Sequence, residues 1–109
     1  MTNNLNSIEK QSIFKVLMDI ASADGITHPN EANYIVAVIE AIGMSDEEMQ
    51  KGVKLNTIQA IVNLKEMTES KKIQTLTYMR ALMDTDGNVH ENESKLFRNV
   101  ADFIGFEVL

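Results

Sequence analysis

One acidic loop occurs twice in this chain. ADGITHPNE at residues 23–31 returns as TDGNVHENE at residues 85–93, at a shift of 62 residues and without a gap. The residues that coincide are Asp24 with Asp86, Gly25 with Gly87, His28 with His90, Asn30 with Asn92 and Glu31 with Glu93. The match continues through the next segment to Gly43 and Gly105. We therefore expect an internal duplication with equivalent halves at about residues 12–44 and 74–106.

Apolar residues recur at three- and four-residue spacing along the chain, which is the pattern of amphipathic helices. Two such stripes follow the acidic loops and correspond to each other: Tyr34, Ile35, Val38, Ile39 and Ile42 in the first half, and Leu96, Phe97, Val100, Ala101 and Ile104 in the second. No alternating run indicates a strand. The sequence predicts an all-α fold, with residues 1–109 forming a single compact bundle of six or seven helices.

Helix boundaries are marked by capping residues. Thr27 or His28 is expected near the start of a helix with Pro29 in its first turn and Gly43 at its end. Ser45 with Glu48 forms a predicted capping box at the start of a short helix. The starts of two later helices are assigned to Asn56 and to either Thr68 or Ser70.

Composition excludes several classes of function. The chain has 16 acidic and 10 basic residues, a net charge of −6 and no cysteine. The negative charge argues against nucleic acid as a partner, and the absence of cysteine excludes disulfides and is consistent with the cytoplasm. The longest aliphatic run, at residues 34–39, is too short to span a membrane. No nucleophile or phosphate-loop motif is present, so we expect no enzymatic activity.

The repeated loop resembles a calcium-binding EF-hand only in part. With glycine at the sixth position, Asp84, Asp86 and Glu93 fall at positions that supply oxygen ligands in the second copy. The leading acid is replaced by Ile20 in one copy and Leu82 in the other, which argues against an orthodox EF-hand. A purely structural interpretation also accounts for the loop, because glycine allows a left-handed turn and acids favour a helix N-terminus.

Each copy places a histidine three residues before the glutamate, as His28 with Glu31 and His90 with Glu93. If the helix already runs through the histidine, residues at this spacing share a helical face, and such a pair can hold a transition metal. The alternative is that both histidines are exposed residues at helix starts.

Two segments carry a family resemblance: SADGITHPNEANYIVAVIEAIGM and DTDGNVHENESKLFRNVADFIGF. Each has an acidic loop, a glutamate, and a helix that closes on glycine and an apolar residue, and in this the chain resembles the tellurite-resistance TerB family of small all-helical bacterial proteins. The resemblance implies a role in tellurite and other stress responses and a possible metal site. It would transfer that site to Asp24, Glu31, Asp86 and Glu93, with Asp84 as an extra acid opposite Ser22.

Two hypotheses follow for function. One is a TerB-like stress protein that binds a divalent cation (calcium, magnesium, manganese or zinc) at the paired loops. The other is a metal-free helical module whose loops are structural and which binds a protein partner through an apolar groove. A two-fold arrangement would bring the loops together into one composite site. A separation of Gly25 and Gly87 beyond roughly 20 Å, too far for facing side chains to bridge, would exclude that site.

Overall fold

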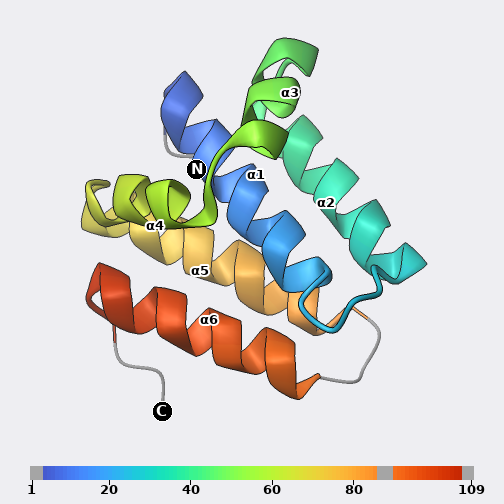
Figure 1. Cartoon of the computed structure of the whole chain (residues 1–109). Helices are drawn as coiled ribbons and strands as arrows, with labels where there is room; N and C mark the ends of the chain where they lie inside the picture. The colour runs from blue at the N-terminus through green and yellow to red at the C-terminus, as the bar shows by residue number, and fades with distance from the viewer. Residues whose placement is uncertain (1–3, 86–89, 107–109) are drawn as a thin grey trace.

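Figure 1 shows the computed structural model of the chain, which describes residues 4–85 and 90–106. It contains six α-helices: α1 (Ser7–Ala21), α2 (Pro29–Ile42), α3 (Asp46–Lys54), α4 (Thr57–Lys65), α5 (Glu69–Met83) and α6 (Glu91–Ile104). These two described ranges contain no strand. The molecule is nearly isometric, with extents of 32 × 29 × 28 Å. The predicted all-α bundle is therefore confirmed.

The helices begin and end at the capping residues that the sequence marks. His28 is the N-cap of α2, Pro29 is its first residue, and Gly43 ends it in a left-handed conformation with φ of 69°. The predicted capping box at Ser45 is formed, since its hydroxyl accepts from the Glu48 amide at 3.1 Å. Thr68, rather than Ser70, is the N-cap of α5. Local side-chain hydrogen bonds to unpaired amides thus determine most of the helix starts.

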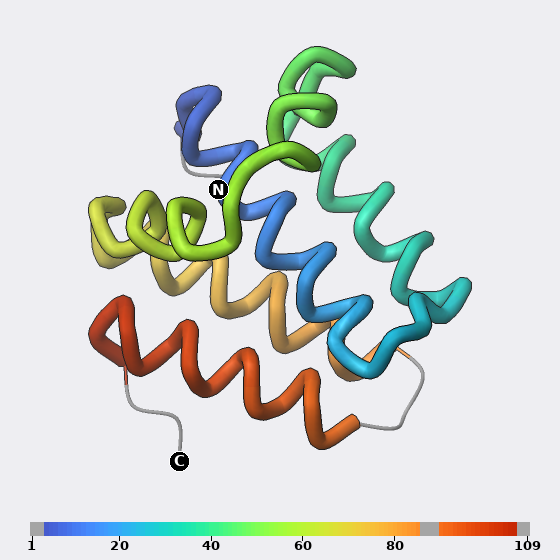
Figure 2. The backbone as a smooth tube through the Cα atoms, in the orientation of Figure 1, coloured from blue at the N-terminus to red at the C-terminus, as the bar shows by residue number. Residues whose placement is uncertain are grey.

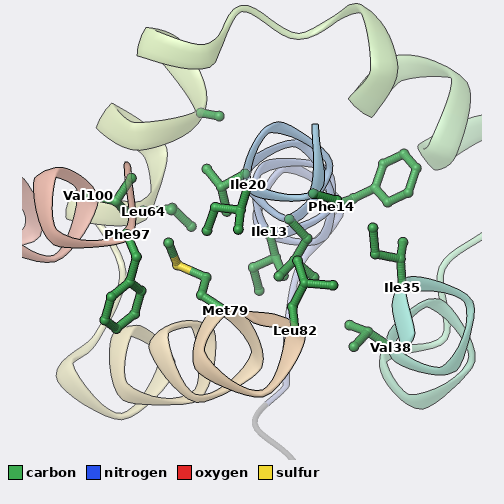
Figure 3. Close-up of a cluster of buried hydrophobic side chains, with 14 of the residues drawn as sticks. Ile13, Phe14, Ile20, Ile35, Val38, Leu64, Met79, Leu82, Phe97 and Val100 are labelled. Carbon is green, nitrogen blue, oxygen red and sulfur yellow. The ribbon is translucent and has the colours of Figure 1, made fainter. Parts of the chain in front are cut away.

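The core is built around α1, which contacts each of the other five helices. Three of its apolar residues, Ile13, Leu17 and Ile20, have no exposed surface. Figure 3 shows α1 side chains surrounded by residues of four other helices: Ile35 and Val38 from α2, Leu64 from α4, Met79 and Leu82 from α5, and Phe97 and Val100 from α6. Burial of this surface is the main stabilising contribution.

The two helix pairs on either side of the acidic loops have matching boundaries. A shift of 62 residues carries Ser7–Ala21 onto Glu69–Met83 and Pro29–Ile42 onto Glu91–Ile104. Gly105 ends α6 in a left-handed conformation, as Gly43 ends α2. The backbone trace in Figure 2 shows that α2 and α6 start at the same end of the molecule. Superposition of the halves 12–44 and 74–106 stays a prediction.

Candidate functional site

The first acidic loop turns on Gly25, whose φ is 89°. Its amide donates to the Ser22 carbonyl at 2.9 Å, which closes the turn directly after α1. Asp24 then accepts a hydrogen bond from the Ile26 amide at 3.1 Å through Oδ1. That amide, and to a lesser degree the nearby imidazoles of His90 and His28, lowers the pKa of the Asp24 carboxyl. Asp24 is therefore held as a carboxylate with its other oxygen, Oδ2, directed to the histidines.

His28 and His90 bring the two copies of the motif into contact. They are the N-cap residues of α2 and α6. Their rings stack, with centroids 5.2 Å apart and an interplanar angle of 11°. Asp24 Oδ2 lies 3.6 Å from His28 Nε2 and 3.8 Å from His90 Nδ1. Each of the three residues offers a ligand atom, and these atoms lie within 4.8 Å of one another.

Two glutamates lie in the first turns of the same helices and are almost completely buried. Glu31 is 1% exposed and Glu93 is 0% exposed. Glu31 Oε1 accepts a hydrogen bond from the His28 amide at 3.2 Å, as expected for a residue that reaches back to a helix N-terminus. Neither carboxylate oxygen of Glu93 has a hydrogen-bond partner within the described ranges. The equivalent positions therefore differ in their surroundings.

Burial raises the pKa of Glu93 to about 7, and the neighbouring Glu31 carboxyl is the next largest cause. The charge of Asp24 raises this pKa further, while His90 opposes the shift. Glu93 therefore lies close enough to Glu31, Asp24 and His90 to respond to their charges. These four residues and His28 form what we call the paired-loop cluster.

The remaining predicted ligands are not part of the described cluster. Asp84 is exposed at the end of α5, where it lines an apolar groove with Arg80 and Phe106. Asp86 and Gly87 lie outside the described residues, so the predicted left-handed turn at Gly87 and the distance between Gly25 and Gly87 are outside them too. The predicted left-handed turn at Gly25 is confirmed.

Sequence reasoning identified both histidines but not their stacking. The signal that could have indicated it was their identical position in two copies of one loop. If the copies pack about an approximate two-fold axis, equivalent residues near that axis meet each other. Periodicity alone does not locate the axis, because it gives the buried face of each helix and not the partner of that face.

No curated protein matches this chain. A crystal structure of a protein of unknown function from Porphyromonas gingivalis W83 has the same fold, with a TM-score of 0.83 and 20% sequence identity over 100% of this chain and 86% of that chain. Residues 1–54, about half of the chain, match the family described as tellurite resistance protein TerB. This match confirms the resemblance, and over residues 1–54 the chain is TerB-like.

Proposed function

We propose that this TerB-like protein binds a divalent cation at the paired-loop cluster and acts in a stress response without catalysing a reaction. The observation that carries the proposal is the convergence of the Asp24 carboxylate with two imidazoles, whose ligand atoms lie within 4.8 Å of one another. Asp24 and His28 come from one loop, and His90 joins them from the N-terminus of α6, 62 residues after His28 in the sequence.

Electrostatics supports the same conclusion. Asp24, Glu31 and Glu93 lie in one small region, and two of them are buried. Like charges in one region repel one another, and they repel more strongly when they are buried. A bound cation would offset this repulsion and would lower the cost of the charge on the buried Glu93. The candidate ions are calcium, magnesium, manganese and zinc.

The test is calorimetric titration of chelator-treated protein with each of these four ions. We expect saturable binding of at least one ion, with an affinity that depends on Asp24. The variant Asp24→Asn should weaken that binding by at least about tenfold, since it removes a ligand charge and changes little else. Asp102→Asn makes the same change at an exposed position near the end of α6 and should bind as the unmodified chain does.

Absence of binding, or equal affinity in Asp24→Asn, would refute the proposal. The stress-response role has a separate test in cells. A strain that lacks this protein should grow less well on tellurite, and Asp24→Asn should fail to restore growth where Asp102→Asn succeeds.

A second candidate function is supported by a separate surface. An apolar groove of about 490 Å³ lies along α5, lined by Ile73, Leu76, Thr77, Arg80, Ala81, Asp84 and Phe106. Ile73 is 49% exposed, so apolar surface is accessible there. Such a groove favours a protein-interaction module. For this candidate we expect an apolar dye to bind the groove and fluoresce. Leu76→Lys should suppress this fluorescence, and a chelator should leave it unchanged.

A further inference from the structure

We infer that the paired-loop cluster selects a first-row transition-metal ion, such as zinc or manganese, over calcium and magnesium, with the imidazoles of His28 and His90 as two of its ligands. This inference rests on the proposed function, because it names the class of cation that the same cluster takes. The partial likeness of the acidic loops to an EF-hand would instead favour calcium.

The donor atoms are the first argument. Calcium takes six to eight oxygen ligands, and magnesium also prefers oxygen. The described cluster offers two imidazole rings beside the Asp24 carboxylate, so two of the three nearest donors are nitrogen. Imidazole with carboxylate is a donor set typical of zinc, manganese and iron, which bind with four to six ligands. The nitrogen content of the cluster therefore favours a transition metal.

The distances are the second argument. Both nearest ring nitrogens face one oxygen, Asp24 Oδ2, at 3.6 and 3.8 Å. These separations are longer than ordinary hydrogen bonds. Ligand bonds of about 2.1 Å around a zinc or manganese ion place neighbouring donor atoms roughly 3 Å apart. Small side-chain rotations that shorten each separation by less than about 1 Å would therefore bring the three donor atoms into position around an ion.

Glu93 supplies a third argument, which concerns the presence of a cation at the cluster. Its side chain is fully buried, and neither of its oxygens has a hydrogen-bond partner in the described part of the chain. A buried carboxylate without such partners is costly unless a proton or a cation neutralises it. Glu93 lies near both Asp24 and His90. Glu93 would therefore add a nearby negative charge to the two nitrogen donors and the Asp24 carboxylate that lie within ligand distance of one another.

The experiment compares zinc, manganese and calcium binding to the full chain after chelator treatment. We expect zinc or manganese to bind at least about 100-fold more tightly than calcium, because imidazole nitrogen is a weak ligand for calcium. The double variant His28→Gln/His90→Gln should lose most of this preference, while Asp102→Asn should retain it. Circular dichroism of each variant establishes whether the helices are intact.

A second measurement uses the unmodified chain and therefore does not depend on the folding of a variant. Binding of zinc should shift the imidazole ¹⁵N resonances of His28 and His90, whereas calcium should leave them unchanged. Equal or tighter binding of calcium would overturn the inference and leave the proposed cation function intact. Zinc binding without a change at either imidazole would also overturn it. If no ion binds, both this inference and the proposed cation-binding function are wrong.

Discussion

Glu93 is an acid held where its charge is disfavoured. Its pKa is raised from 4.5 to about 7, chiefly by burial and then by the Glu31 carboxyl. Below pH 4.5 the group is protonated in both the folded and unfolded chain and costs nothing. As the pH rises towards 7, the unfolded chain loses this proton more readily, so folding stability falls. Above about pH 7 the penalty is constant.

Replacing Glu93 with glutamine should therefore stabilise the metal-free protein at pH 8 by about 1 kcal/mol or more, and by less at pH 5. Urea unfolding in the presence of a chelator measures both values. Glu91→Gln is the matched control, because Glu91 is exposed in the first turn of the same helix. A Glu93→Gln variant that gains more stability at pH 5 than at pH 8 would contradict the assigned direction of the shift.

Single residues also show what the sequence can and cannot predict about the cluster. In the sequence alone, the 62-residue register aligns His28 with His90 and Glu31 with Glu93. It could not predict that Glu31 caps its helix while Glu93 has no described hydrogen-bond partner. That difference arises from tertiary packing around two equivalent positions, and local sequence does not encode it.

At the scale of the elements, the turn between α1 and α2 depends on a glycine. Gly25 has φ of 89°, and an added Cβ would meet nothing within 4 Å. The cost of Gly25→Ala is therefore a backbone cost alone, about 1 kcal/mol, because alanine resists a left-handed conformation. Thermal or urea unfolding of the variant measures it.

Gly25→Asn is the informative comparison for this turn, since asparagine adopts positive φ more readily than alanine does. It should lose less stability than Gly25→Ala, although its side chain is larger. Equal losses in the two variants would point to a steric cause instead. Because Gly25 follows Asp24 directly, Gly25→Ala should also weaken cation binding.

Helix ends were predictable to the extent that they are determined locally. Ser45 and Asn56 accept hydrogen bonds from amides two or three residues ahead, and such bonds depend on few neighbours. The start of α5 was ambiguous because Thr68 and Ser70 carry equivalent hydroxyls. The observed cap is Thr68, which accepts from the Lys71 amide at 3.3 Å. The sequence patterns thus predicted most helix starts but did not predict how the helices pack against one another.

For the molecule as a whole, the central position of α1 is the property that sequence patterns did not predict. Its apolar stripe resembles those of the other helices, yet α1 contacts all five of them. Hydrophobic periodicity reports that one face is buried but not how many elements cover it. The family match ends at Lys54, so it includes α1 to α3 and none of the later helices.

This organisation predicts that residues 1–54 do not fold alone, although they are the segment that matches the family. Half of the buried hydrophobic cluster belongs to later residues, namely Ala60, Leu64, Met67, Met79, Leu82, Met83, Phe97, Val100 and Ile104. Removing these residues exposes the faces of α1 that contact α4, α5 and α6. Each large apolar side chain left exposed forfeits about 1.5–3 kcal/mol, so losing several exceeds the 5–15 kcal/mol that typically holds a domain together.

The fragment 1–54 should show little helical circular dichroism, no cooperative unfolding transition and poorly dispersed amide resonances. A chain truncated after Phe106 keeps every described helix and should unfold cooperatively, which makes it the control. Truncation to residues 1–54 also removes His90 and Glu93, so the fragment should lose tight zinc binding even when its concentration is raised. A fragment that unfolds cooperatively would instead mean that α1 to α3 form an autonomous unit, and that α4 to α6 add the second half of the cluster to a fold that is already stable.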